Sequence, residues 1–389
     1  MIAVINGKIV MPDGMVEGKT LLLNEERILG LSEAPGKARR IIDAQGRYVL
    51  PGFIDLHSDK VEQFIQPRPT AQMDFELALK ECERELLHQG ITTMYHSLSL
   101  YQDEFFGKAP LRTRQNVQRF ADMVAGLHLR SHLIHHRFHL RIEIDNLEAY
   151  DIAKAMIADK KVHLLSFMDH TPGQGQYRSL EIYEKTISNY HGKEITELGM
   201  EGVIAYHKEK PTLSLRQLRE LTALAHENGI PVASHDDDTA EKLRLNKAIG
   251  VDISEFPIWI DTAKEARREG LYTVVGAPNI LLGGSHSGNM SAAEAVREDC
   301  ADILCSDYYP PAILHSIFLM HRQHGIPLWE MVNRATLNPA KAMGIDGDYG
   351  SLQPGKKADL LIVNLLDGYP VITHVLVDGK TTARVEYRR

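Results

Sequence analysis

His57 and Asp59 are two side chains whose types and spacing suit a metal ion. They follow an apolar run from Val49 to Leu56 that predicts a buried strand. Because side chains alternate along a strand, His57 and Asp59 project in the same direction from its end. An imidazole and a carboxylate placed together suit a divalent ion such as zinc, manganese or iron. The alternative is a hydrogen bond between the two side chains that caps the strand.

Other apolar runs also end in polar side chains that bind metals or move protons. His139, Arg141 and Glu143 alternate along one run, so they share one face of the predicted strand. The remaining runs lead to His96, to Asp169 and His170, to His235 and Asp236–Asp238, to Glu255, to Ala277-Pro278-Asn279, and to Asp307-Tyr308-Tyr309. All but one of these ends carry His, Asp or Glu, which indicates a shared functional site.

The segments between these runs have the periodicity of helices. Residues 74–88 place Phe75, Leu79 and Cys82 at helical spacing, and Ser214 is expected to cap a later helix. The expected strands are residues 49–56, 91–95, 138–144, 162–168, 231–234, 251–254, 271–275 and 301–304. Strands that alternate with helices in this way predict an α/β fold, a (β/α)₈ barrel of the TIM type. Its functional groups lie at the carboxyl ends of the strands.

Both ends of the chain contain short runs of strand character instead. Residues 1–10, 20–23, 27–31 and 40–42 alternate with turn signals, and so do residues 358–364, 370–377 and 381–387. Residues 1–50 alone are too few for an independent core. We therefore expect residues 1–50 and 346–389 to form one small β-sandwich domain, with the barrel, residues 51–345, inserted between them.

Composition excludes several classes of function. The formal net charge of −8 argues against general binding to nucleic acid or to an anionic membrane. No apolar stretch approaches eighteen residues and no leader is evident, so we expect a cytoplasmic protein. Cys82, Cys300 and Cys305 lack the spacing of a zinc site or a disulfide frame and are expected to be buried thiols. The oligomeric state stays open, a homo-oligomer included.

Several motifs resemble the amidohydrolase superfamily: Pro51-Gly52-x-Ile54-Asp55-x-His57, the Asp that ends the eighth strand, Asn338–Ala342 and Gly350–Leu360. Members usually carry His-x-His where this chain has His57-Ser58-Asp59. A narrower resemblance, to the PhnM family of diphosphatases in the carbon–phosphorus lyase pathway, includes that Asp. It is carried by His57-Ser58-Asp59, Pro67-Arg68-Pro69, His139-Leu140-Arg141, Met168–Gln174, Ala233–Asp237, Gly276–Asn279, Gly283–Asn289 and Ser306–Pro310.

The resemblance implies hydrolysis of α-D-ribose 1-methylphosphonate 5-triphosphate to the 5-phosphate and diphosphate at a metal centre. Divalent ions hold phosphate oxygens and lower the pKa of water. We hypothesise two ions, zinc first and manganese or iron as alternatives. His57, Asp59 and Asp307 would bind one ion, Glu143 would bridge, and His170 with His235 would bind the other, while Asp307 would act as general base.

Some assignments stay open between two residues or two roles. Glu255 competes with His170 as the sixth ligand, and imidazole is the commoner zinc ligand. Asp236 is expected to orient His235, and Asp237 and Asp238 are expected to be solvated. For the phosphorylated small-molecule substrate, the expected contacts are Arg68, His139, Arg141, His286, Ser287 and Asn289. The alternatives are a plain surface loop at Gly283–Asn289 and an Arg141–Glu143 ion pair.

Two other functions remain compatible with the sequence. One is an amidohydrolase that cleaves a C–N bond in a small phosphorylated or acidic substrate, which released ammonia or amine would distinguish from released diphosphate. The other is a noncatalytic binding protein on the same fold. The apparently complete set of metal-binding side chains favours an enzyme over a binding protein.

Overall fold

Eight parallel strands form the central sheet of the molecule. The computed structural model describes residues 1–68, 70–100, 110–171, 175, 202, 204–206, 209–284 and 289–388. The strands pair in the order β15-β14-β13-β12-β11-β10-β9-β8, and a parallel bridge between Ser58 and Asp307 links its two edges. Their bounds are β8 Phe53–Ser58, β9 Ile91–Leu100, β10 His135–Glu143, β11 Leu164–Met168, β12 Val232–His235, β13 Ile253–Glu255, β14 Tyr272–Gly276 and β15 Ile303–Cys305. The predicted (β/α)₈ barrel is confirmed.

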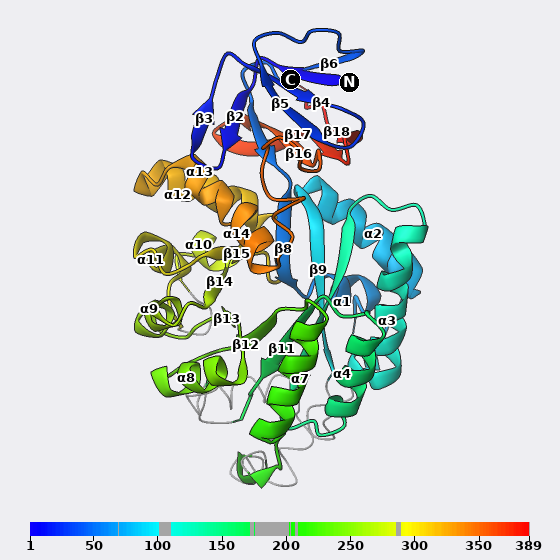
Figure 1. Cartoon of the computed structure of the whole chain (residues 1–389), viewed down its shortest axis with the longest axis vertical. Helices are drawn as coiled ribbons and strands as arrows, with labels where there is room; N and C mark the ends of the chain where they lie inside the picture. Colours follow the sequence, from blue (N-terminus) through cyan, green and yellow to red (C-terminus); the bar gives the residue numbers. More distant parts are fainter. Residues whose placement is uncertain are drawn as a thin grey trace.

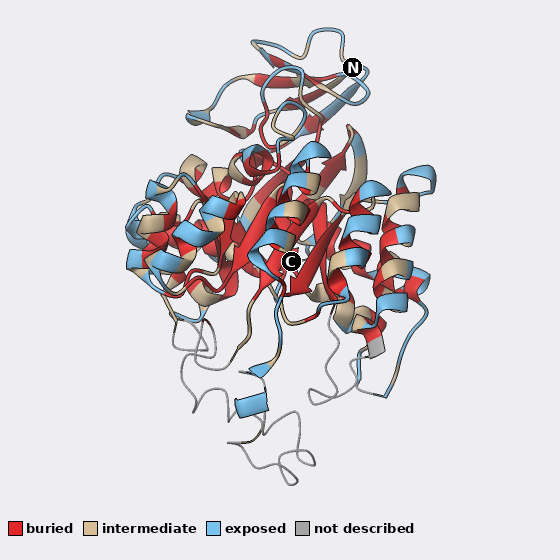
Figure 2. Cartoon of the chain, turned by 60° about the horizontal axis from the view of Figure 1, so that its bottom comes forward, coloured by how far each residue is buried: buried red, intermediate tan, exposed pale blue. Residues whose placement is uncertain are grey.

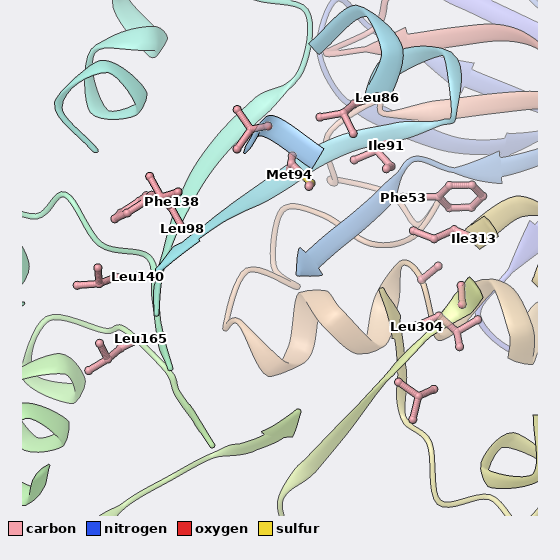
Figure 3. Close-up of a cluster of buried hydrophobic side chains, with 14 of the residues drawn as sticks. Phe53, Leu86, Ile91, Met94, Leu98, Phe138, Leu140, Leu165, Leu304 and Ile313 are labelled. Carbon is pink, nitrogen blue, oxygen red and sulfur yellow. The ribbon is translucent and has the colours of Figure 1, made fainter. Parts of the chain in front are cut away.

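Helices cover the outer surface of this sheet, and Figure 2 shows buried strands enclosed by helices with exposed outer faces. Phe138 and Leu140 belong to the large hydrophobic cluster on that outer face (Figure 3). The helices are α1 Lys60–Ile65, α2 Phe75–His88, α3 Arg114–Gly126, α4 Ala149–Ala158, α7 Leu215–Glu227, α8 Ala240–Ile249, α9 Ile260–Arg268, α10 Ala277–Leu281, α11 Ala292–Arg297, α12 Ala312–His324, α13 Leu328–Asn333 and α14 Leu337–Ala342. Since Phe138 and Leu140 face outward, their odd-numbered neighbours on β10 face into the barrel.

The capping residues explain where two of the predicted helices begin. Asp74 accepts hydrogen bonds from the backbone N–H groups of Glu76 and Leu77 at the start of α2. Ser214 and Gln217 form a reciprocal capping box at the start of α7. Both caps satisfy backbone donors that a helix leaves unpaired at its first turn.

The single strand predicted from Val49 to Leu56 is wrong, because this run is divided between two sheets. β7 (Tyr48–Pro51) belongs to a sheet of the chain termini, and β8 begins the barrel after Gly52. A Cβ atom at position 52 would lie 2.1 Å from Thr92 Oγ1, so only glycine fits where the chain changes sheets. An apolar run does not reveal such a change of partner.

His96 was expected at the end of a strand, and that placement is wrong. β9 continues to Leu100, so His96 lies inside the strand and faces outward. Its Nε2 lies 2.8 Å from His136 Nδ1, and its ring packs edge-on against Phe120. His96 is therefore part of the packing between β9, β10 and α3.

The two ends of the chain build two further sheets, which Figure 1 shows stacked at one end of the barrel with both termini. One has the order β5-β4-β1-β6, and the other has the order β18-β17-β16-β7-β2-β3. The strands are β1 Ile2–Ile5, β2 Lys8–Met11, β3 Gly14–Val16, β4 Thr20–Leu23, β5 Ile28–Ser32, β6 Arg40–Asp43, β16 Leu360–Leu366, β17 Tyr369–Val377 and β18 Lys380–Arg384. Leu21, Ile362 and Leu376 share one buried cluster between them. The numerical domain boundaries stay a prediction.

The barrel strands begin beside these terminal sheets. The N–H of Gly52 donates to Asp359 O over 3.0 Å, and His135 Nε2 at the start of β10 lies 3.0 Å from Asp359 Oδ2. The carboxyl ends of the strands therefore lie at the opposite end, where a TIM-type barrel carries its functional groups. The three cysteines are buried and free, as predicted. In the described part of the chain, no helix is long and apolar enough to cross a bilayer.

Candidate metal centre

Three buried side chains converge inside the barrel from β8, β10 and β13. His57, His139 and Glu255 each offer a ligand atom, and these atoms lie within 4.8 Å of one another. His57 Nδ1 is 3.1 Å from Glu255 Oε1, and His139 Nε2 is 3.7 Å from Glu255 Oε2. Two imidazoles and a carboxylate in this arrangement are a donor set that suits zinc and related divalent ions.

The protonation of His139 shows that this group fits a cation. His139 Nδ1 lies 3.0 Å from the carbonyl oxygen of Leu56, which can only accept, so Nδ1 carries the proton. Burial lowers the pKa of His139 to about 3, so its other nitrogen, Nε2, presents a lone pair. This buried atom has no hydrogen-bond partner and faces the Glu255 carboxylate. A metal ion between the two acceptors would satisfy both.

Glu255 is held in its charged form by its neighbours. Burial alone raises the pKa of Glu255, but its electrostatic interactions with His139 and His57 and its hydrogen bond with His57 outweigh burial and lower it. Ser166 Oγ also donates to Glu255 Oε2 over 2.7 Å. The carboxylate is therefore ionised and fixed in orientation, as a metal ligand requires.

A second group lies beside the first and contains His170, His235 and Asp236. His235 Nδ1 is 2.9 Å from Asp236 Oδ2, and His170 Nε2 is 3.8 Å from the same oxygen. The rings of His57 and His235 have centroids 5.5 Å apart, so the two groups adjoin. Glu143 Oε1 contacts His170 Nδ1 at 2.6 Å, which brings Glu143 to this second group.

Arg141 places a guanidinium cation between the two predicted ligands Asp59 and His235. Its Nη1 donates to Asp59 Oδ1 over 3.0 Å, and its Nη2 donates to His235 Nε2 over 3.4 Å. His139, Arg141 and Glu143 thus share the inner face of β10, as their alternation predicted. The alternative role for Arg141, an ion pair with Glu143, is not among the contacts of the described residues, where Arg141 pairs with Asp59 instead.

Asp307 lies next to His57 at the closure of the barrel. Its N–H donates to His57 O over 3.0 Å, and its carbonyl accepts from the N–H of Asp59 over 3.2 Å. Burial raises the pKa of Asp307, against the lowering effect of His57. Among the described residues, Asp59 and Asp307 are not members of the close groups of metal-ligand atoms. Their predicted role as ligands stays a prediction.

Three residues that lie one or two positions after barrel strands adopt a left-handed backbone conformation. They are Asp236, Phe256 and Asp307, with φ values of 54°, 53° and 53°. Such conformations cost a non-glycine residue about 1 to 2 kcal/mol, and they concentrate at functional sites. Here each one turns the chain at the barrel mouth beside a candidate ligand.

Asp237 was expected to be solvated, and that expectation is wrong. Its side chain is fully buried and accepts from Ser234 Oγ and Ser254 Oγ, each over 2.5 Å. Asn246 Nδ2 donates to its other oxygen over 2.7 Å. Asp237 therefore ties β12 to β13 behind the two groups, a role that a run of three acidic residues does not reveal.

Arg112 is a second cation near the site that the sequence reasoning missed. Its Nη2 lies 3.0 Å from Glu62 Oε2. Burial alone lowers the pKa of Arg112, but the charges of Glu62, Asp59 and Glu143 raise it. Arg112 therefore sits in the same electrostatic environment as the predicted ligands. It lies outside the barrel strands, so no strand-end pattern could identify it.

The other predicted substrate contacts are less completely placed. Arg68 is exposed on the loop between α1 and α2. Asn289 lies just before α11, whereas His286 and Ser287 lie outside the described residues. A further group of potential ligands, His135, Asp359 and Asp378, lies at the opposite end of the barrel. Lys357 Nζ lies 3.0 Å from Asp378 Oδ1 there, so the ammonium group of Lys357 already forms an ion pair with one member of that group.

Comparisons with known proteins agree with this architecture. Residues 48–382 match the sequence model of the Amidohydrolase family. The chain is 31% identical over 383 residues to the α-D-ribose 1-methylphosphonate 5-triphosphate diphosphatase of Escherichia coli (strain K12), covering 96% of this chain and 98% of that protein. It is 22% identical to an imidazolonepropionase of Rhizobium meliloti, covering 91% and 87% of the two chains.

Solved structures with this fold include the L-hydantoinase from Arthrobacter aurescens. That protein superimposes with a TM-score of 0.64 at 16% identity, over 98% of this chain and 96% of its own. The N-acetylglucosamine-6-phosphate deacetylase from Pasteurella multocida superimposes with a TM-score of 0.62 at 13% identity, over 98% and 99% of the two chains. At such identities the likeness concerns the fold alone.

Proposed function

Because this chain belongs to the amidohydrolase family, we propose that it is a metal-dependent diphosphatase for α-D-ribose 1-methylphosphonate 5-triphosphate. The products are the corresponding 5-phosphate and diphosphate, a step in phosphonate catabolism. Identity of 31% to the Escherichia coli diphosphatase over nearly the whole chain supports this substrate. The single observation that supports a metal is the unpartnered His139 Nε2 opposite the Glu255 carboxylate.

We assign two divalent ions, zinc foremost, to the two adjoining groups. His57, His139 and Glu255 hold one ion. His170 and His235 hold the other, with Glu143 beside them. Such ions polarise phosphate oxygens and lower the pKa of water when they are bound. This assignment makes Glu255 a ligand together with His170, and moves His139 from a substrate contact to a ligand.

The residues of the chain perform the remaining tasks. Asp307 accepts the proton of the attacking water as general base, since its backbone holds it beside His57. Arg141 and Arg112 supply positive charge for a triphosphate near the two groups, and a planar guanidinium matches phosphate oxygens in pairs. In a protein of net charge −8, these two cations, together with the assigned ions, would offset the carboxylates of the site when an anionic substrate approaches.

A release assay tests the proposal directly. The purified protein with the triphosphorylated ribose phosphonate should release one diphosphate per substrate, and Asp307→Asn should lower kcat about 100- to 10,000-fold. Asp252→Asn is the matched control, because Asp252 precedes β13 at the opposite end of the barrel. Release of ammonia or amine from candidate substrates, with no diphosphate, would favour the C–N hydrolase instead. Full activity in Asp307→Asn would refute the assignment of the base.

A further inference from the structure

A cavity of about 550 Å³ lies between the two terminal sheets, away from the metal groups. Its walls come from β6 at the edge of one sheet and from β16, β17 and β18 of the other. Four basic side chains line it: Arg40, Arg47, His374 and Arg384. The proposed reaction uses none of them.

The guanidinium groups in this cavity have few compensating charges. Arg40 Nη2 donates to Thr381 Oγ1 over 2.5 Å, and Arg47 Nη2 donates to Gln45 Oε1 over 2.8 Å, so both partners are neutral. Within the described residues, the ion pairs of 4.0 Å or less include neither arginine. A guanidinium has five N–H donors, so each retains several for a ligand.

The two carboxylates of the cavity, Asp43 and Glu386, offset the charge of its three guanidinium groups only in part. Asp43 Oδ1 accepts from Asn6 Nδ2 and from the N–H of Gln45, over 3.0 and 2.9 Å. Glu386 pairs with Arg384 where both side chains are largely exposed, at 74% and 64%. Exposed pairs of this kind are weak because water screens both charges, so an incoming anion can compete for Arg384.

The pKa of His374 shows the effect of the positive charges that line the cavity. Burial lowers the pKa of His374, and the charges of Arg384, Arg47 and Arg40 lower it further. The three guanidinium groups therefore act on one imidazole from three different strands or turns. The net charge of the whole chain is −8, so this cluster of positive side chains has the opposite sign to the chain as a whole.

We propose that this cavity binds a small organic phosphate, separately from the metal centre. Three guanidinium groups suit a doubly charged phosphate better than a singly charged carboxylate, because guanidinium binds phosphate through paired N–H donors. Thr373 and Thr381 line the same cavity and add hydroxyl groups. Ile41, Leu366 and Tyr387 provide apolar wall for the organic part of the ligand.

Chemical protection of arginine tests the site residue by residue. The full-length protein is treated with phenylglyoxal, with and without diphosphate as the probe, and each modified arginine is quantified by mass spectrometry. Diphosphate should slow the modification of Arg40 and Arg47 at least fivefold. Arg39 is the internal control, because it is exposed next to Arg40 but does not line the cavity. Equal rates with and without diphosphate at Arg40 and Arg47 would overturn the proposal.

Calorimetry on variants gives an independent readout. The double variant Arg40→Gln/Arg47→Gln should lose diphosphate binding in the cavity of the terminal sheets but keep diphosphate binding at the metal centre. It should also keep hydrolytic activity, because both residues are remote from the metal groups. Lys380→Gln is the matched control, since Lys380 is an exposed cation on β18 that does not line the cavity. Lys380→Gln should retain diphosphate binding both in the cavity and at the metal centre. Acetate as the titrant separates phosphate binding from binding of any anion: equal affinity for acetate would contradict the assignment of phosphate.

Discussion

His139 Nε2 and Glu255 Oε2 face each other over 3.7 Å in the buried interior of the barrel. The nitrogen presents a lone pair and the oxygen belongs to a charged carboxylate, so direct contact between them is unfavourable without a cation. His57 contacts the other oxygen of Glu255 at 3.1 Å, which completes the group. The buried interior of the barrel therefore contains a group of side chains that suits a metal ion.

Glu255→Gln should abolish most metal binding at the first group. The amide keeps the size of the side chain but loses its charge, so metal per chain should fall by about one ion and kcat by at least about 100-fold. Elemental analysis of the purified protein measures the loss. Glu83→Gln is the control, because Glu83 also makes a buried contact with a histidine, His136 at 3.0 Å, but on the outer face of the barrel. It should keep its metal; equal metal loss in both variants would point to a general structural effect.

Arg141→Lys should weaken substrate binding more than metal binding. Lysine keeps the charge but cannot donate to Asp59 and to a phosphate with the same planar fork, so KM should rise about 10- to 100-fold. Steady-state kinetics together with metal analysis checks this. Arg334→Lys is a suitable comparison, because Arg334 is also buried and pairs with Asp299 at 3.1 Å, at the far end of the barrel. An unchanged KM in Arg141→Lys would exclude Arg141 from substrate recognition.

His135→Asn should destabilise the joint between the barrel and the terminal sheets, and the effect should depend on pH. Burial alone lowers the pKa of His135, but its hydrogen bond with Asp359 and the charges of Asp359 and Asp378 outweigh burial and raise it. A histidine whose pKa is raised by folding contributes fully to the free energy of unfolding at pH values below its unfolded pKa of about 6.5. This contribution is lost as the pH rises through the pKa of the histidine in the folded protein.

Denaturant unfolding at several pH values measures this contribution. The variant should lose about 1.5 to 3 kcal/mol at acidic pH, and its difference from the wild type should shrink as the pH rises. His226→Asn removes the exposed contact of His226 with Asp252 and should cost no more than about 1 kcal/mol. A difference between wild type and His135→Asn that grows with pH would show that the charged imidazole does not stabilise the joint.

Gly52→Ala should disrupt the point where the chain passes from the terminal sheet into the barrel. Its Cβ would lie 2.1 Å from Thr92 Oγ1 and 2.8 Å from Thr92 Cβ, so the backbone must shift. We expect a loss of about 1 to 3 kcal/mol or more in unfolding free energy, measured by denaturant titration. A Cβ at Gly347 meets nothing within 4 Å, so Gly347→Ala should change stability by no more than about 0.5 kcal/mol. Equal stability of the two variants would contradict the predicted clash.

Periodicity along the sequence predicted the barrel, and the resemblance of short motifs predicted the family. Alternating helices and strands predicted the (β/α)₈ order, and the period of two along His139, Arg141 and Glu143 predicted their common face. These inferences succeed because they depend on neighbours along one strand. The same local logic predicted that Asp236 orients His235; their side chains lie 2.9 Å apart, and the orienting role stays a prediction.

Only the tertiary structure decided which strands bring their side chains together. Glu255 lies between His57 and His139 because the curvature of the closed sheet carries β13 across the barrel from β8 and β10. It likewise decided that Gly52 separates two sheets, that Asp237 is buried, and that Arg40, Arg47 and Arg384 converge. These relationships join residues far apart in the chain, and the packing of whole sheets, which no local pattern encodes, sets their distances.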